Sequence, residues 1–192
     1  MIYGELSSNF NANIDKYKLK GKTVFSTPWF NIIESYYSDI SNIPYYGLQL
    51  LDYCNILAIT NQSEIVLVKQ YRPAVDKYTL EFPGGHVEKE QKPEQAVKNE
   101  LYEETGYIAG EIKLLGVLDP DVGRLANKVW CYYSTDISKP VDGKWIPEKN
   151  VDLIKYPIEK ISELVKNNQL NNAMNIAALY LAVQKGIDLQ EI

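Results

Sequence analysis

The chain has 192 residues, of which 45% are hydrophobic and 23% are charged. This balance is typical of one folded domain with room for a small additional module, and it excludes a largely disordered chain. The net charge of −5 argues against a nucleic-acid surface, because phosphate backbones are bound by basic residues.

The N-terminus and the spread of apolar residues argue against export and against a membrane. The first residues lack a basic region followed by an apolar run, so no signal peptide is expected. No apolar stretch approaches the roughly 18–20 residues of a membrane-spanning helix. Cys54 and Cys131 lie in apolar segments and are too few for a disulfide framework, which predicts buried free thiols. We therefore expect a cytoplasmic protein.

The first fifty residues predict a small module of β-strands. Short β-like runs at residues 23–25 and 30–33 alternate there with turn-prone residues. A different pattern, with longer apolar runs, begins after them. We therefore expect an N-terminal β-module in residues 1–50 and the main domain in residues 51–192.

The main domain begins with a predicted β-hairpin. An apolar run at residues 55–59 is followed by a polar turn and a second run at residues 65–68. Another short strand, at residues 79–82, ends in a proline and two glycines. A chain reversal is therefore expected directly after this third strand.

A helix is predicted next, and both of its ends carry recognisable signals. Pro93 stands where the missing N–H of a first helical residue costs nothing, and Gly106 is placed as a C-terminal cap. Val97 and Leu101 lie four apart and give the helix one apolar edge. The helix should run from Pro93 to about Thr105.

The rest of the chain predicts more strands and two closing helices. The strands are expected near residues 113–118 and 128–133, and the helices at residues 158–167 and 172–184. Strands and helices follow one another without regular alternation. A mixed sheet flanked by helices, an α/β (α+β) sandwich, therefore fits better than a doubly wound parallel sheet.

Three acidic residues of the predicted helix, Glu100, Glu103 and Glu104, share one face because they lie at positions i, i+3 and i+4. Carboxylates this close repel one another unless a cation lies among them. A hard divalent cation such as Mg²⁺ takes oxygen ligands and would remove the repulsion. The alternative is a solvated acidic face without a function. Gly84 and Gly85 favour the metal, because a glycine turn after a strand can offer a backbone carbonyl.

The segment from Gly85 to Tyr107 reads GHVEKEQKPEQAVKNELYEETGY. It resembles the Nudix box, whose pattern is Gly, five residues, Glu, seven residues, then Arg-Glu-aliphatic-x-Glu-Glu-x-Gly-aliphatic. Six positions of the strand, loop and helix match the box in register: Gly85, Glu100, Leu101, Glu103, Glu104 and Gly106. The resemblance implies the Nudix α/β/α sandwich and a metal-dependent hydrolase of diphosphate linkages.

Three positions depart from the box. Gln91 stands in place of its first Glu, Asn99 in place of its Arg, and Tyr107 in place of an aliphatic residue. The family's Arg is thought to orient the glutamates. Since the first two changes remove opposite charges, we hypothesise that an amide contact between Gln91 and Asn99 replaces an ion pair.

The resemblance also implies roles for individual residues. Glu100 and Glu104 would be metal ligands, Glu103 would take part in metal binding or act as a base, and the Gly84 carbonyl would be a further ligand. Glu81, on the strand before the box, would be an outer ligand or an acidic group beside the substrate. The cations, Mg²⁺ or Mn²⁺, would polarise a phosphoryl oxygen and help to generate the attacking hydroxide.

In the part of the family that this chain resembles, the general base often comes from a loop late in the chain. Glu148 is the candidate for that role, and Asp152 is the next choice. The alternative for Glu148 is a solvated charge on a loop. His86, the only histidine, is interpreted as a loop residue near the site and not as a metal ligand.

Segments upstream of the box resemble the ADP-ribose pyrophosphatase branch of the family. They read VKQYR at residues 68–72 and LEFPGG at residues 80–85. By this resemblance Arg72 would face a substrate phosphate, a task that suits a guanidinium group. The alternative for Arg72 is an ordinary salt bridge.

Two further candidates for substrate binding lie outside the box. STPWF at residues 26–30 resembles the N-terminal module of that branch, which is exchanged across a homodimer and can stack aromatic residues on adenine. Trp29 would be the stacking residue, unless it belongs to the core or a dimer interface. The turn-rich loop at residues 119–124 would contact the terminal ribose, with Arg124 reaching phosphate, unless the loop only connects two strands.

The sequence thus predicts hydrolysis of ADP-ribose, or of a related nucleoside diphosphate sugar, to a nucleoside monophosphate and a sugar phosphate. A homodimer and a small-molecule substrate are expected, and neither a nucleic-acid nor a membrane partner. Two alternatives stay open: a nucleoside triphosphate or dinucleoside polyphosphate as the substrate, and a non-catalytic Nudix module that only binds a nucleotide.

Overall fold

The structure is a computed structural model that describes residues 19–37, 42–140 and 145–189. It divides into two compact units. The N-terminal unit comprises the described residues up to Leu50 together with Val122–Ala126, and the main unit comprises the others.

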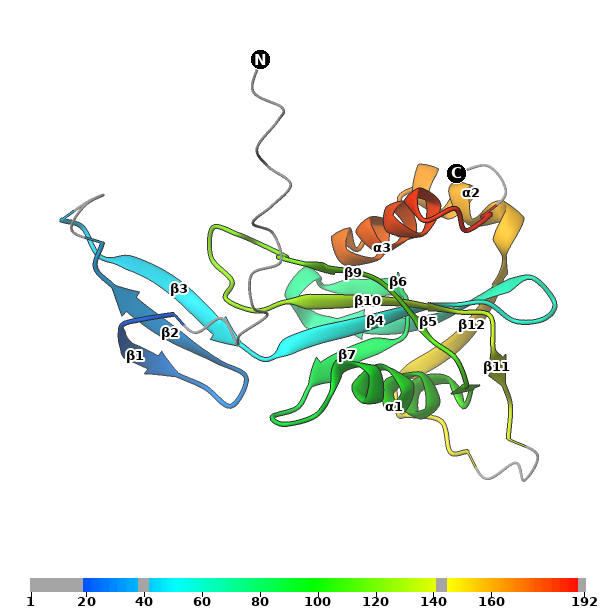
Figure 1. Cartoon of the computed structure of the whole chain (residues 1–192), viewed down its shortest axis with the longest axis horizontal. Coiled ribbons are helices and arrows are strands. Elements are labelled where there is room, and N and C mark those ends of the chain that lie inside the picture. The colour runs from blue at the N-terminus through cyan, green and yellow to red at the C-terminus, as the bar shows by residue number, and fades with distance from the viewer. Residues whose placement is uncertain (1–18, 38–41, 141–144, 190–192) are drawn as a thin grey trace, which may run out of the picture. The chain divides into compact units, whose positions relative to one another are not determined.

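The N-terminal unit is a three-stranded antiparallel sheet in the order β1-β2-β3 (Figure 1). Its strands are β1 (Lys22–Ser26), β2 (Phe30–Ser35) and β3 (Tyr45–Leu50). The strands expected at residues 23–25 and 30–33 are confirmed. The segment Val122–Ala126 joins this sheet because Leu48 donates its N–H to the Arg124 carbonyl and accepts from the Ala126 N–H, at 2.7 and 2.8 Å.

The main unit contains a mixed four-stranded sheet and an antiparallel three-stranded sheet. The mixed sheet has the order β7-β4-β10-β9, with β10 parallel to β4 and the other neighbours antiparallel. Its strands are β4 (Asp52–Ala58), β7 (Gly84–Val87), β9 (Lys113–Leu118) and β10 (Val129–Ser134).

The three-stranded sheet has the order β12-β5-β6. It consists of β5 (Glu64–Arg72), β6 (Lys77–Glu81) and β12 (Val151–Pro157). The short strands β8 (Ile108–Ala109) and β11 (Ile137–Ser138) form a separate pair.

The hairpin predicted between residues 55–59 and 65–68 is wrong. Both runs are strands, but β4 and β5 belong to different sheets and share only one isolated bridge, between Ile59 and Ile65. The reason lies in β4, whose two edges are already paired with β7 and β10. No edge of β4 is left for β5, which pairs with β6 and β12 instead.

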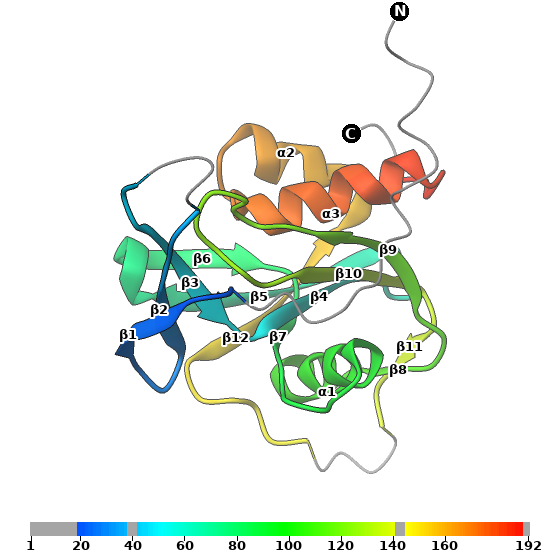
Figure 2. The ribbon, with the colours of Figure 1, turned by 60° about the vertical axis from the view of Figure 1, so that its left-hand side comes forward.

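Helices cover the strands of the main unit on both faces. The helix α1 (Pro93–Thr105) lies on one face, and α2 (Ile161–Lys166) and α3 (Ala173–Gln184) lie on the other (Figures 1 and 2). Two 3₁₀ turns, η1 (Pro73–Val75) and η2 (Ile158–Lys160), precede β6 and α2. This is the mixed α/β/α arrangement expected from the sequence. Within the described ranges, every helix is too short or too polar to cross a bilayer.

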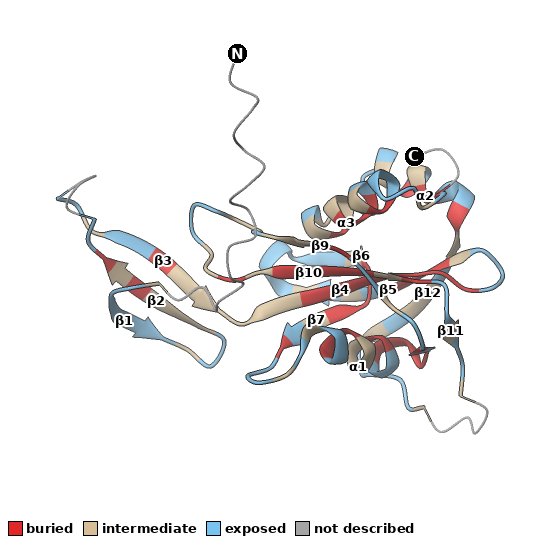
Figure 3. Cartoon of the chain, in the orientation of Figure 1, coloured by how far each residue is buried: buried red, intermediate tan, exposed pale blue. Residues whose placement is uncertain are grey.

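The central strands are largely buried (Figure 3), and their side chains alternate between two cores. Leu57 and Leu67 point to the core beneath α2 and α3, whereas Ile56 and Val66 point to the core beneath α1. This is the period-two alternation of a strand whose two faces are both covered. Cys54 and Cys131 are buried free thiols, one in each core, as predicted.

Two elements differ from the expectations. Residues 151–157, which include Asp152, form the strand β12 along β5 and not a loop. His86 also lies in a strand, because β7 begins at Gly84 and pairs His86 with Tyr53 of β4. In both cases the partner strand supplies the hydrogen bonds that define the element.

The helix α1 begins and ends where the sequence predicts. Pro93 is in its first turn, and Gly106 caps it in the left-handed conformation with φ 71°. The Gly106 N–H donates to the Tyr102 carbonyl at 2.8 Å. A Cβ atom on Gly106 would lie 2.6 Å from the ring of Trp145, so a side chain is excluded by space as well as by conformation.

Gly106→Ala is expected to destabilise the chain more than Gly186→Ala does. Gly186 also has a positive φ, 73°, but a Cβ atom there would have nothing within 4 Å, so alanine costs only the left-handed strain of about 1 kcal/mol. At Gly106 the collision with Trp145 is added, and we expect a loss of about 2 kcal/mol or more. Urea denaturation measures both losses, and equal losses would contradict the close packing of Trp145.

Candidate functional site

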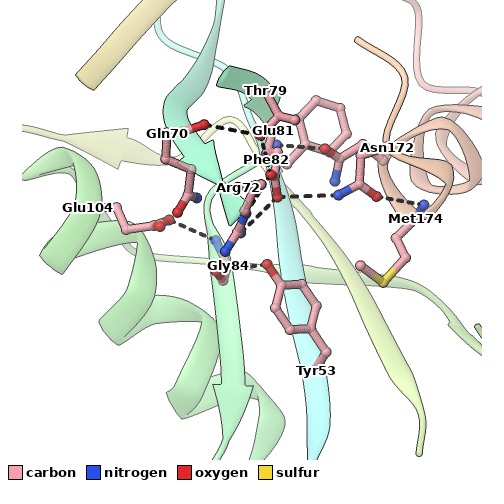
Figure 4. A network of polar contacts seen from close by, with 11 residues as sticks. Tyr53, Gln70, Arg72, Thr79, Glu81, Phe82, Gly84, Glu104, Asn172 and Met174 are labelled. Atoms are coloured by element: carbon pink, nitrogen blue, oxygen red, sulfur yellow. Dashed lines mark hydrogen bonds and ion pairs between the residues drawn. The ribbon is translucent and has the colours of Figure 1, made fainter. Parts of the chain in front are cut away.

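The backbone of Gly84, at the start of β7, is held through both its N–H and its carbonyl. Its N–H donates to Glu104 Oε2 at 2.9 Å, and its carbonyl accepts from the Tyr53 hydroxyl at 2.9 Å (Figure 4). A Cβ atom at this position would collide with the Cys54 carbonyl, so the close approach of β7 to β4 requires glycine. The Gly84 peptide is therefore fixed against α1.

The next residue, Gly85, makes room for a carboxylate. A Cβ atom there would collide with the carboxyl group of Glu100. The side chain of Glu100 thus occupies the space that any other residue at position 85 would fill. The last two turns of α1 are packed by their acidic face onto the glycine strand.

Burial and neighbouring negative charge act together on the carboxylates of Glu100, which is half-buried, and Glu104, which is buried. Burial, followed by the charges of Glu103, Glu148 and Glu88, raises the pKa of Glu100 to about 7. Burial raises the pKa of Glu104 to about 8, with Glu100 and Glu148 adding to it and the Gly84 N–H and Arg72 opposing it. The three charged groups that raise the pKa of Glu100 are all carboxylates. A positive charge would therefore be strongly favoured beside these carboxylates.

Arg72 and Glu81 form a bidentate ion pair next to this site. Arg72 Nε and Nη2 donate to the two Glu81 oxygens at 2.8 and 2.9 Å, and Thr79 Oγ1 and Asn172 Nδ2 add bonds of 2.6 and 3.3 Å (Figure 4). Burial alone would raise the pKa of Glu81, but the bonds from Arg72, Thr79 and Asn172 hold it below its usual value. Asn172 also caps α3, because its Oδ1 accepts from the Met174 N–H at 3.0 Å.

Glu148 lies on the loop before β12 and lines a pocket with the C-terminal end of α1. The other residues of the pocket are Tyr102, Glu103, Trp145 and Ile146. The charge of Glu148 acts on both Glu100 and Glu104. Four carboxylates thus share this end of the helix.

Residues 53–177 match the family model of the NUDIX domain. The match covers more than half of the chain. The chain belongs to the Nudix hydrolase family. This confirms the family and the fold that the box between Gly85 and Gly106 predicts.

Named proteins resemble this Nudix chain along most of its length. A "Methanol dehydrogenase activator" of Bacillus methanolicus is 29% identical over 134 residues, which cover 69% of this chain and 72% of the relative. The "ADP-ribose pyrophosphatase" of Bacillus subtilis (strain 168) is 26% identical over 138 residues, covering 71% and 75%. A crystal structure of an "ADP compounds hydrolase" superposes with a TM-score of 0.70 and 18% identity, covering 87% of this chain and 94% of the other.

The structure brings most of the predicted site residues of this Nudix domain together. Glu100, Glu103, Glu104, Glu148 and the Gly84 peptide lie at the C-terminal half of α1 and its neighbouring loops. Glu81 and Arg72 are the last residues of the antiparallel strands β6 and β5, and their side chains are bonded to each other along the strand pair. The remaining two candidates, Trp29 and Arg124, belong to the N-terminal unit.

The residues around Gly84 fit a hard divalent cation by their chemistry. Among the described residues, no three acidic, histidine or cysteine side chains already converge on one point. The fit rests on the donor set: the carboxylates of the half-buried Glu100 and the buried Glu104, both with raised pKa values, lie beside the two glycines at the start of β7, and Gly85 leaves room for a carboxyl group. These oxygen donors are the ones that Mg²⁺ and Mn²⁺ take.

The hypothesis of an amide contact between Gln91 and Asn99 is wrong. Gln91 Oε1 accepts from the Glu88 N–H at 3.2 Å, and Asn99 Oδ1 accepts from Gln95 Nε2 at 2.7 Å. Each amide has a local partner close in sequence, because loop and helix geometry places Gln95 one turn before Asn99. Neither residue replaces the positive charge that the box usually carries.

The sequence offers weak signals for three other residues of the site. In the sequence Tyr53 is only an aromatic residue at the start of an apolar strand. Its role in the site becomes visible in the structure, through its hydrogen bond to the Gly84 carbonyl. Asn172 carries a helix-capping signal, but its bond to Glu81 crosses ninety-one positions. Trp145 stands in a polar loop, and its contact with α1 crosses forty-two positions.

Arg72→Met is expected to destabilise the chain by about 2 kcal/mol at neutral pH, because the buried Glu81 carboxylate loses its two strongest donors. Removing one partner of a fully buried ion pair typically lowers the free energy of unfolding by about 3–5 kcal/mol. The Arg72 side chain is 40% exposed, and solvent therefore reduces this loss. Glu81→Gln should cost less, since Arg72 can then be hydrated.

The loss caused by Arg72→Met should depend on pH. In the wild type the lowered pKa of Glu81 gives stability above its unfolded pKa, which is lost as the pH falls through the folded pKa. In the variant burial raises the pKa of Glu81, so its penalty also disappears on acidification. The difference in unfolding free energy should therefore shrink between about pH 7 and about pH 4. Urea denaturation with chelator present tests this, and a constant difference would contradict it.

Proposed function

We propose that this Nudix hydrolase cleaves the diphosphate of ADP-ribose, or of a related nucleoside diphosphate sugar, to a nucleoside monophosphate and a sugar phosphate. The observation that carries the proposal is the packing of the Glu100 and Glu104 carboxylates against Gly84 and Gly85 at the start of β7 in a Nudix domain. The names of the similar pyrophosphatase and ADP compounds hydrolase support this class of substrate.

We assign the cation, Mg²⁺ or Mn²⁺, to Glu100, Glu104 and the Gly84 carbonyl, with Glu103 beside them. When bound, such a cation supplies Lewis-acid polarisation of a phosphoryl oxygen and makes a nearby water more acidic. The Tyr53 hydroxyl holds the Gly84 carbonyl, and the Glu104 carboxylate holds the N–H of the same residue in the preceding peptide group. The protein thereby fixes the direction of the carbonyl before any ligand arrives.

The proton of the attacking water goes to Glu148 in this proposal. Glu148 is exposed on its loop and lines the same pocket as Glu103, so it can reach both solvent and the acidic face of α1. Asp152 is the less favoured choice, because it is part of β12 opposite Lys69. A base near the reacting water typically contributes about 10²–10⁴ in rate.

Arg72 is assigned to a substrate phosphate through the part of its guanidinium that Glu81 does not use. The bonds to Glu81 engage Nε and Nη2, and Nη1 is the donor we assign to the phosphate. Glu81, Thr79 and Asn172 hold the guanidinium plane in place. Glu81 then acts as a support for Arg72 beside the substrate.

Glu104→Gln should abolish the magnesium-dependent release of AMP from ADP-ribose while leaving the fold intact. The amide keeps the shape and can still accept from the Gly84 N–H, but it removes a charged metal ligand. A loss of several kcal/mol of transition-state stabilisation corresponds to roughly a 1,000-fold lower kcat. The matched control is Glu163→Gln, an exposed glutamate on α2, which should keep wild-type activity.

The same assay should compare ADP-ribose with other sugar nucleotides, dinucleoside polyphosphates and nucleoside triphosphates. Faster turnover of a triphosphate or of a dinucleoside polyphosphate than of every sugar nucleotide would contradict the proposed substrate class. Binding without turnover of any of them would instead indicate a non-catalytic module. Near-normal turnover by Glu104→Gln would remove its assigned metal role.

For the N-terminal unit we propose base stacking by Trp29, phosphate or ribose contact by Arg124, and a cytoplasmic homodimer. Trp29 is 71% exposed, which argues against a place in the core of the described chain. Other large apolar side chains of the unit are exposed as well, namely Val24, Phe25, Tyr36 and Tyr46. Exposed apolar groups of this kind are typical of a surface that another molecule covers.

Trp29→Ala should raise the KM for adenine-containing substrates more than it lowers kcat, because stacking contributes about 1–3 kcal/mol to base binding. Trp29→Phe keeps a flat ring and should recover most of the affinity. Sedimentation velocity of both variants reports the oligomeric state separately. An unchanged KM together with loss of the dimer would assign Trp29 to the interface and contradict stacking.

A further inference from the structure

The loop that carries Glu148 has few contacts of its own. Residues 146–150 are exposed, and Ile146 exposes 84% of its surface. On the C-terminal side the loop is fixed at Val151, which pairs with Gln70 and donates to the Glu148 carbonyl at 3.3 Å. On the N-terminal side the nearest described residue with tertiary contacts is Trp145, three positions before Glu148.

Trp145 is bound to the C-terminal end of α1 by three kinds of contact. Its Nε1 donates to the Glu103 carbonyl at 3.0 Å. Its ring lies against Gly106, where a Cβ atom would be only 2.6 Å away. The ammonium group of Lys139 lies 4.7 Å from the centroid of the Trp145 ring and 4.5 Å from that of Tyr107.

These contacts satisfy a helix end that would otherwise lack partners. The last four carbonyls of an α-helix receive no hydrogen bond from N–H groups of the helix itself, so other donors must supply it. In α1 the Tyr102 carbonyl accepts from Gly106, the Glu103 carbonyl from Trp145, and the Thr105 carbonyl from Lys139 Nζ at 2.7 Å. A cation at this end is also favourable for the helix dipole. The loop therefore completes the C-terminus of the box helix.

The position of Glu148 follows from the two anchors. Three residues of extended chain reach about 10 Å, so Glu148 cannot move far from either Trp145 or Val151 while both are held. Without Trp145, the described residues 145–147 would lose the hydrogen bond to the Glu103 carbonyl and the packing against Gly106 that hold them to α1. Glu148 and Glu103 would then no longer be kept on the same pocket.

We propose that Trp145 is a positioning residue, which clasps the Glu148 loop to the C-terminal turn of α1 and thereby holds Glu148 at the pocket that it shares with Glu103. Lys139 supports the clasp by its contact with the Trp145 ring. The assignment of Glu148 as the base rests on the proposed function, whereas the clasp itself rests on the contacts of Trp145.

The activity test compares Trp145→Ala, Trp145→Phe, Glu148→Gln and the double variant Trp145→Ala/Glu148→Gln. A displacement of a reacting group by about 1 Å costs on the order of 100-fold in rate, so Trp145→Ala should lower kcat by about that factor with a smaller change in KM. Trp145→Phe keeps the ring against Gly106 and should restore most of kcat. The exposed Tyr180→Ala on α3 is the matched control and should behave as wild type.

The double variant separates positioning from an independent role. If Trp145 acts through Glu148, removing both should cost no more than Glu148→Gln alone. A loss equal to the product of the two single losses would overturn the proposal. A raised KM with normal kcat in Trp145→Ala would also overturn it, because Trp145 would then bind substrate directly.

Hydrogen exchange tests the clasp without any substrate. The Val151 amide, which donates to the Glu148 carbonyl, should exchange at least about tenfold faster in Trp145→Ala than in wild type, and Trp145→Phe should lie near wild type. Unchanged exchange in Trp145→Ala would overturn the clasp. If the wild-type enzyme hydrolysed none of the substrates but the exchange rose as expected, the proposed function would fail while the clasp would stand.

Discussion

The site depends on two carboxylates on one face of α1, those of the buried Glu104 and the half-buried Glu100. They are packed against Gly84 and Gly85 at the start of β7, where the charges that act on Glu100 are all acidic and Glu104 has the charge of Arg72 opposing those of Glu100 and Glu148. Burial of like charges is unfavourable, and their raised pKa values express that cost. A divalent cation would relieve it, so the same arrangement that costs stability in the chain alone favours the metal site that we propose.

The surrounding elements keep this arrangement from relaxing. Tyr53 holds the Gly84 carbonyl from β4, so the turn cannot rotate away from the helix. The Arg72–Glu81 pair links the neighbouring strands β5 and β6, and Asn172 ties that pair to the N-terminus of α3. Each support comes from a different part of the chain. The site is therefore a product of the whole main unit and not of the box alone.

Local signals predicted the box helix well, and long-range pairing limited the rest. Pro93 and Gly106 mark the ends of α1 because each acts on its own backbone conformation. Nothing local decides which strand pairs with β4, and the two edges filled by β7 and β10 overturned the expected hairpin. The spacing of the glutamates predicted a shared face, but it could not show that Arg72 is bonded to Glu81 or that Trp145 reaches α1.

The central claim is that the carboxylates of Glu100 and Glu104 form a divalent cation site. Titration with Mn²⁺, with free Mn²⁺ measured by electron paramagnetic resonance, tests this most directly because it needs no substrate. We expect saturable binding by the wild-type chain, displacement by excess Mg²⁺, and binding weakened by about 10-fold to 100-fold in Glu104→Gln. Equal binding by wild type and by Glu104→Gln, or no saturable binding by the wild type, would contradict the account.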